Sequence, residues 1–258
     1  MKLRAALVAA CVLASAARAG AAGPDFDGAR AWKDLQALAA AGPRRASPPG
    51  ARGLIGERLR QAGFRAREAP FGDGRANLIG ERAGRRTELV IVAARCDAGD
   101  ASGPAALLEL ARALSAAELA GTLRLVFFDG PAGSEALAAQ MSRERELGRV
   151  RALITLDRVA DTDLRLETSL LAAPELVVRA FAAARPLAPP PLFAGFPQAH
   201  FDGDHLPFVR RGLRAVLPLA SLRKPGRARA PRVSRESLAR AGAFALALVR
   251  DLASAATP

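Results

Sequence analysis

Acidic side chains follow three apolar runs of this 258-residue sequence, and a histidine precedes the fourth. Asp100 lies in the segment RCDAGDASG (95–103), Asp129 and Asp157 each come directly after a run of apolar residues, and His205 lies in GDHLPFVRRG (203–212). Aspartate combined with histidine is ligand chemistry that suits Zn²⁺ or a similar cation. His205, Asp100 and Asp157 are therefore candidate metal ligands.

Each of these residues also has a structural interpretation. Asp100 or Ser102 can cap the helix that follows, Asp129 can fix a turn, and His205 can be a half-buried histidine with its hydrogen bonds satisfied. Taken one at a time, the structural interpretations are favoured. The joint placement of the three acids after apolar runs and of His205 just before the next run makes a shared site more plausible than any one residue does.

The apolar runs themselves predict the strands of a covered sheet. Continuous apolar segments suit a sheet with helices on both faces, and helical patterns alternate with them. This alternation predicts an α/β fold, a three-layer α/β/α sandwich with a mixed, mostly parallel sheet. The expected strands are 88–94, 122–128, 152–156 and 213–219, preceded by a hairpin over 64–70 and 75–80. The expected helices are 26–41, 50–62, 103–116, 134–146, 173–184 and 236–253.

Ligands of open α/β sheets bind outside the carboxyl ends of the strands. The segments that contain Asp100, Asp129, Asp157 and His205 are therefore expected to meet at one end of the sheet. We expect a single domain over 20–253, followed by a flexible tail at 254–258.

The first 19 residues have the pattern of a secretory signal peptide. Lys2 and Arg4 precede an apolar stretch, and Ala17 and Ala19 form an A-x-A cleavage site. The apolar stretch is too short for a permanent membrane span. The pattern predicts an exported protein, periplasmic or secreted. Lipid attachment at Cys11 is disfavoured because the apolar run before it is short.

The chain is strongly basic, with a formal net charge of +13. Nucleic-acid binding would favour aromatic side chains among the basic ones, and the Arg-rich segment 222–235 has none. A solvated basic loop is the favoured interpretation, and recruitment of an anionic partner is the alternative. Without the leader, Cys96 is the only cysteine, so no internal disulfide is possible.

Several blocks resemble the metal-dependent aminopeptidases of the M28 class, and most closely their glutaminyl-peptide cyclotransferase branch, the glutaminyl cyclases. The similarity covers nearly all of the chain after residue 19. The blocks are WKDLQALAAAGPRRASPPGARG (32–53), ANLIG (76–80), DASGPAALLELARAL (100–114), LRLVFFDG (123–130), ALITLD (152–157) and DHLPFVRRG (204–212).

This resemblance implies an exopeptidase-like fold and, in the cyclase branch, one zinc ion bound by Asp, Glu and His. It also implies a second Glu that acts as general acid and base while N-terminal glutamine cyclises to pyroglutamate. His205 matches the zinc-binding histidine, with Asp204 beside it, and Asp157 matches the acid after the third long strand. Asp157 and Asp204 are thus the candidate catalytic residues.

The chain departs from the family pattern at several positions. The family has H-x-D where this chain has Arg95-Cys96-Asp97, and the bridging Asp falls on Gly99. The paired glutamates fall on Pro131 and Ala132, which cannot bind a metal or transfer a proton.

The absence of these family side chains predicts weaker binding of zinc and slower catalysis. Loss of a general base alone lowers rates by about 10²- to 10⁴-fold. Arg95, a permanent cation, would repel Zn²⁺ and could instead pair with Asp97 or Asp157. Glu135 lies past the missing pair and is not expected to replace it.

Two hypotheses follow. The first is an exported cyclase-like or aminopeptidase-like enzyme that uses His205, Asp157 and Asp100. The second is a pseudoenzyme that binds peptide or protein N-termini. A phosphate site at Gly99 to Gly103 does not have G-x-G-x-x-G spacing, and a serine hydrolase would require a G-x-S-x-G elbow. Cys96 could pair with His205 as a nucleophile, but a buried structural thiol is favoured.

Overall fold

The computed structural model describes residues 25–41, 50–96, 100–187, 192–195, 202–221 and 233–254. The predicted signal peptide, Asp97, Gly99 and residues 222–232 of the Arg-rich segment lie outside these ranges. None of the described helices is long and apolar enough to cross a membrane.

A seven-stranded mixed sheet forms the middle layer, in the order β1-β2-β4-β3-β5-β7-β6. The hairpin β1–β2 and the two-residue strand β6 pair antiparallel at the two edges, and β4, β3, β5 and β7 run parallel between them. The strands are β1 (Arg65–Gly72), β2 (Arg75–Arg82), β3 (Leu89–Arg95), β4 (Thr122–Phe128), β5 (Val150–Asp157), β6 (Leu166–Glu167) and β7 (Val216–Ser221).

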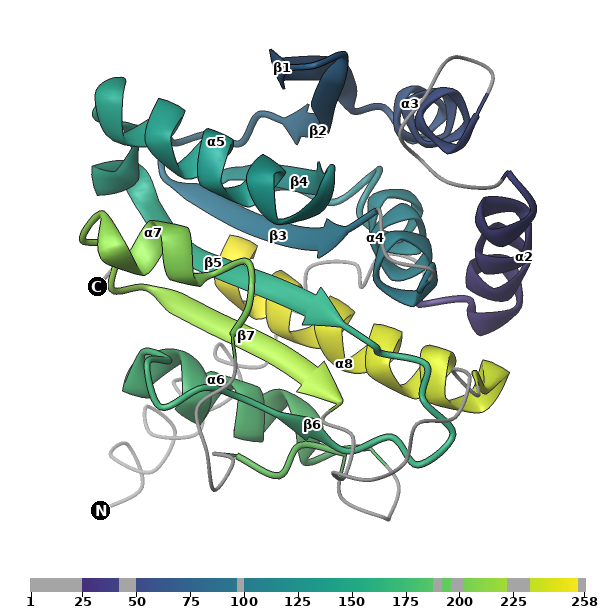
Figure 1. Cartoon of the computed structure of the whole chain (residues 1–258). Helices are drawn as coiled ribbons and strands as arrows, with labels where there is room; N and C mark the ends of the chain where they lie inside the picture. The colour runs from purple at the N-terminus through teal and green to yellow at the C-terminus, as the bar shows by residue number, and fades with distance from the viewer. Residues whose placement is uncertain are drawn as a thin grey trace, which may run out of the picture.

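Helices cover both faces of this sheet, which confirms the predicted three-layer fold (Figure 1). Helices α5 (Gly130–Arg143) and α7 (Leu206–Arg210) lie on one face, and α4 (Ser102–Ala113) and α8 (Arg235–Ser254) lie on the other. The remaining helices are α2 (Gly28–Ala40), α3 (Ala51–Gln61), α6 (Pro174–Ala184) and a short 3₁₀ helix at Glu146–Arg149.

The alternation of side chains along β3 divides the core into two layers. Val90 and Val92 pack with the larger cluster, which includes residues of α2, α4 and α8, whereas Leu89 and Ile91 pack with the smaller cluster beside α5 and α7. Successive side chains of a strand point to opposite faces, so a continuous apolar run is what a sheet covered on both faces needs. The four long strands were predicted on this basis.

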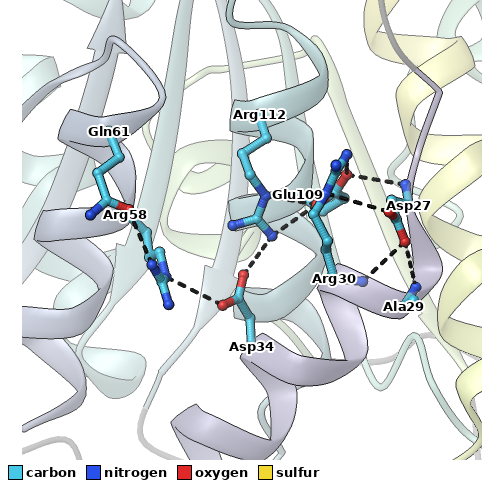
Figure 2. Close-up of polar contacts among 8 residues, drawn as sticks. All are labelled: Asp27, Ala29, Arg30, Asp34, Arg58, Gln61, Glu109 and Arg112. Atoms are coloured by element: carbon cyan, nitrogen blue, oxygen red, sulfur yellow. Dashed lines mark hydrogen bonds and ion pairs between the residues drawn. The ribbon is translucent and has the colours of Figure 1, made fainter.

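A network of ion pairs around two buried carboxylates attaches the N-terminal helices to α4 (Figure 2). Glu109 of α4 is fully buried and accepts hydrogen bonds from Arg30 of α2 at 2.9 Å and from Arg112 at 2.8 Å. Arg112 also reaches Asp34 of α2 at 2.6 Å, and Asp34 lies 3.5 Å from the Arg58 side chain of α3. The apolar stripe of α2 is therefore supplemented by charged contacts that fix this helix against its neighbours.

Candidate active site

The carboxyl ends of the parallel strands bring the predicted site segments to one edge of the sheet. Arg95 is the last residue of β3, Asp129 follows β4, and Asp157 is the last residue of β5. These strands pair in parallel, so their carboxyl ends meet at the same edge. The expected convergence of these segments is therefore found.

An ion pair between Arg95 and Asp204 occupies this edge. The Nε and Nη2 atoms of Arg95 each donate to a different carboxylate oxygen of Asp204, both at 3.1 Å. The Arg95 side chain is 34% exposed and that of Asp204 only 10%. The sequence predicted a partner at Asp97 or Asp157. Asp204 accepts both bonds of the planar guanidinium, and the charge of Arg95 also acts on Asp157; pairing with Asp97 or Asp157 stays a prediction.

Asp157 binds a different arginine. Its carboxylate lies 3.3 Å from the Nη2 atom of Arg158, and Arg158 also donates to the main-chain oxygen of Ser221 at 3.0 Å. The pKa of Asp157 is raised, mainly by partial desolvation, although 58% of the side chain is exposed, and also by the charges of Asp100 and Asp204; Arg158 and Arg95 act in the opposite direction. The carboxylates of Asp100 and Asp204 are thus close enough to act on that of Asp157.

Asp100 also has a structural role at the start of α4. Its carboxylate accepts a hydrogen bond at 2.7 Å from the backbone N–H of Ser102, the first residue of that helix. The Ser102 side chain is fully buried and accepts from the backbone N–H of Val159 at 3.0 Å. Ser102 therefore joins α4 to the end of β5 and is not presented as a nucleophile.

His205 lies at the N-cap position of α7, and the whole residue is buried. The sequence placed this histidine directly before the fourth long strand, and the structure inserts the five-residue helix α7 between them. Burial lowers the pKa of His205 to about 4, and the nearby charge of Asp202 opposes this shift. The imidazole is therefore neutral at pH 7.

The turn after β4 is shorter than predicted. The expected helix began at residue 134, but α5 begins at Gly130, so Pro131 and Ala132 lie in its first turn and are exposed. The helix therefore begins four residues earlier than predicted, because proline is well tolerated in the first turn of a helix. Gly130 has a φ of +74°, which allows the chain to turn sharply from strand to helix.

Two residues of β2, Arg75 and Asn77, make hydrogen bonds that fix this turn. The buried side chain of Asn77 accepts from the backbone N–H of Asp129 at 3.0 Å and donates to the carbonyl of Gly133 at 2.8 Å. Arg75 donates to the main-chain oxygen of Asp129 and lies 3.4 Å from its carboxylate. Sequence reasoning missed Arg75 and Asn77, because their partners are more than 50 residues away and no local pattern marks them.

Glu135 is directed toward α7. It accepts hydrogen bonds from Arg210 at 2.9 Å and from Arg211, and these bonds hold its pKa below the ordinary value. An ionised carboxylate that is bound by two guanidinium groups is a poor general base. Glu135 therefore does not replace the glutamates that the family pattern places at positions 131 and 132.

The described side chains do not fit a zinc centre. Catalytic zinc needs about three protein ligands and one open position, and within the described ranges no group of three His, Cys, Asp or Glu side chains could hold a metal ion. Asp204, the acid beside His205, accepts two hydrogen bonds from Arg95. The roles of His205, Asp100 and Asp157 as metal ligands stay predictions, since the neighbouring residues 97–99 lie outside the description. Cys96 is buried and forms no disulfide within the described residues.

Comparisons with known proteins agree with this architecture. A glutaminyl cyclase from an Acidobacteriales bacterium superimposes with a TM-score of 0.74 at 22% identity, covering 92% of this chain and 98% of that one. A zinc-dependent exopeptidase from Parabacteroides distasonis gives a TM-score of 0.72 at 19% identity, covering 91% and 100%. An aminopeptidase from Aneurinibacillus sp. strain AM-1 gives 0.72 at 16% identity, covering 89% and 94%. At these identities the likeness shows the fold alone.

A search of curated protein sequences gives no match. The family model of peptidase family M28 matches residues 77–234, a range that contains every candidate site residue. Because this match spans more than half of the sequence, the chain belongs to peptidase family M28.

Proposed function

We propose that this chain is an exported M28-type protein, related to the glutaminyl cyclases, that binds peptide N-termini and has reduced or lost zinc-dependent catalysis. The observation that supports this most directly is the first turn of α5. It presents Pro131 and Ala132 to solvent at the positions that match the family's paired glutamates. Neither side chain can bind a metal or accept a proton.

The surrounding charges support the same proposal. The nearest glutamate, Glu135, is bound to Arg210 and Arg211, and the end of β3 carries a guanidinium where a metal-binding histidine would be expected. Arginine stays protonated at every physiological pH, so its charge opposes the binding of a cation beside it.

Binding of peptide N-termini is the part of the family chemistry that this site could keep. The charges of Asp100 and Asp204 act on Asp157 at the edge of the sheet, and an α-amino group is largely protonated near neutral pH. Arg95 and Arg158 neutralise part of this acidic group. The remaining negative charge favours an ammonium group over a carboxylate.

A direct test combines turnover with binding. We expect a peptide with N-terminal glutamine to give no pyroglutamate above the buffer rate, with or without added zinc. The same peptide is expected to bind more tightly than its N-acetylated form, and Asp157→Asn to weaken this preference. Equal binding of the two peptides by the wild-type protein would contradict the proposed recognition of N-termini.

The alternative function is an active cyclase or aminopeptidase with a site built from His205, Asp157 and Asp100. Solved structures of both enzyme types share this fold, and the histidine and the acid after β5 are both present. Zinc-dependent turnover of the glutamine peptide or of an aminoacyl substrate, abolished by His205→Ala, would establish this alternative and refute the loss of catalysis.

Export and partner choice stay proposals as well. Cleavage after Ala19 would leave a mature chain that begins at Gly20, and mass spectrometry of the protein recovered from the periplasm or medium would identify that terminus. Recruitment of an anionic partner by the 222–235 segment would be seen as binding that weakens steeply with salt.

A further inference from the structure

The Arg95–Asp204 ion pair links two segments that are distant in the sequence. Arg95 ends β3, and Asp204 lies 109 residues later, directly before His205 and α7. The two donated hydrogen bonds, both 3.1 Å long, leave from different nitrogens and reach different oxygens. This two-bond geometry fixes the orientation of both side chains as well as their distance.

Asp204 is largely shielded from solvent, so its charged form needs a cationic partner. Only 10% of its side chain is exposed, and a carboxylate with so little solvent around it is costly unless a positive charge and hydrogen-bond donors accompany it. Arg95 supplies both. For comparison, the ion pair between Arg85 and Glu118 has side chains that are 75% and 84% exposed, and such pairs contribute little to stability.

We infer that the guanidinium of Arg95 takes the structural place of a metal ion in this site, so that the edge of the sheet is assembled in a metal-free chain. Arg95 neutralises Asp204 and holds the segment before α7 against the end of β3. It is a positioning residue for the turn that contains His205. This inference rests on the proposed function, because it describes how a site without zinc-dependent catalysis keeps its shape.

The contacts on the two sides of the pair agree with this role. On one side, the backbone N–H of Cys96 donates to the carbonyl of Phe128 at 2.8 Å, which fixes the position where β3 ends beside β4. On the other side, the backbone N–H groups of Phe208 and Val209 donate to the carbonyl of His205 at 3.1 Å, so that α7 begins immediately after the pair. Arg95 therefore joins two locally ordered segments.

A double-mutant cycle on the full chain tests the inference. The variants are Arg95→Met, which removes the charge at similar size, Asp204→Asn, and the double substitution. Arg95→Lys keeps the charge but not the two-bond geometry, and Arg85→Met is the matched surface control. Melting temperatures are measured for all variants, with EDTA and with added zinc for the wild-type protein.

We expect Arg95→Met to lower the melting temperature by roughly 5–10 °C, as for loss of one partner of a poorly solvated pair. Arg95→Lys should lie between wild type and Arg95→Met, and the double variant should lose clearly less than the sum of the two single variants. Arg85→Met should stay close to wild type, and EDTA or zinc should leave the wild-type melting temperature unchanged.

Two results would overturn the inference. One is an Arg95→Met variant that melts within a degree or so of the Arg85→Met control, or a fully additive cycle. The other is a wild-type protein that loses stability in EDTA and regains it with zinc. Neither melting-temperature measurement depends on peptide turnover. A protein without turnover could still lack the stabilising role of Arg95, and a protein with turnover could have it, so failure of this inference is distinguished from failure of the proposed function.

Discussion

At the scale of single residues, the proposed loss of catalysis rests on three positions at which this chain departs from the family pattern, Arg95, Pro131 and Ala132. An imidazole can ligate a metal, whereas the guanidinium of Arg95 has five N–H donors and no acceptor. Pro131 and Ala132 have no polar side-chain atom. These residues leave the fold intact, because the guanidinium finds a carboxylate at Asp204 and the proline suits the first turn of α5.

The exchanges predict how metal binding could be introduced. The triple substitution Arg95→His, Pro131→Glu and Ala132→Glu removes the permanent cation and adds an imidazole and two carboxylates at the same edge of the sheet. Glutamates also suit the first turn of a helix, where the helix dipole favours negative charge. We expect zinc to raise the melting temperature of this variant, measured by calorimetry, by several degrees.

The double variant Pro131→Glu and Ala132→Glu is the control, since it keeps Arg95 and should respond to zinc much less. An equal response of the double and triple variants would show that the guanidinium does not oppose the metal.

Which residues approach the site could be predicted from the sequence, but which of them pair could not. The positions of Arg95, Asp129 and Asp157 follow from the ends of apolar strands. The pairing of Arg95 with Asp204 depends on the path of the chain before α7, a segment of mixed composition with no periodic pattern. The bond between Arg75 and Asp129 depends likewise on the register of β2 against β4.

At the scale of elements, polar contacts fix how helices and strands join. Arg124 in β4 is 6% exposed and makes ion pairs at 2.7 Å with Glu81 of β2 and with Glu146 of the 3₁₀ helix after α5. The long strands could be predicted because covered strands are continuously apolar. The two-residue strand β6 and the five-residue helix α7 were missed because neither is long enough to show a period.

The ion pairs of Arg124 with Glu81 and Glu146 predict that the stability of the protein depends on pH. The hydrogen bonds from Arg124 lower the pKa of Glu146 below 4.5, against the opposing effect of burial. The folded state therefore binds this proton more weakly than the unfolded state. The stabilising contribution is fully present above pH 4.5 and is lost as the pH falls through the folded-state pKa.

Urea unfolding from pH 7 to pH 3 checks this expectation. The wild-type protein should lose more stability between pH 5 and pH 3 than Glu146→Gln, which lacks the titrating carboxyl. Parallel curves for the two proteins would show that Glu146 does not contribute to acid sensitivity.

At the scale of the whole molecule, part of the large positive charge is used inside the fold. The chain has 38 Lys and Arg residues against 25 Asp and Glu, and several arginines bind buried acids. The network around Glu109 joins α2, α3 and α4 in this way (Figure 2). Each such pair contributes no net charge, so the formal excess of +13 is carried by basic residues outside these pairs.

Glu109 provides the test of this network. Its carboxylate is fully buried and accepts bonds from Arg30, Arg112 and the backbone N–H of Asp27. Glu109→Gln keeps the shape but removes the charge, and hydrogen bonds to charged groups are worth about 1.5–3 kcal/mol. We expect a loss of about 2 kcal/mol in the free energy of unfolding, measured by urea denaturation.

Glu118→Gln is the matched control, because the Glu118 side chain is 84% exposed and its pair with Arg85 should be worth little. Similar losses for the two variants would indicate that the buried network does not attach the N-terminal helices.

The central claim is that this M28 fold keeps its site without zinc, and the zinc content of the full chain tests it most directly. The purified protein is incubated with excess zinc and desalted, and the metal is counted by mass spectrometry alongside His205→Ala. The account predicts far less than one zinc per chain, equal in the two proteins. One zinc per wild-type chain that is lost in His205→Ala would contradict it.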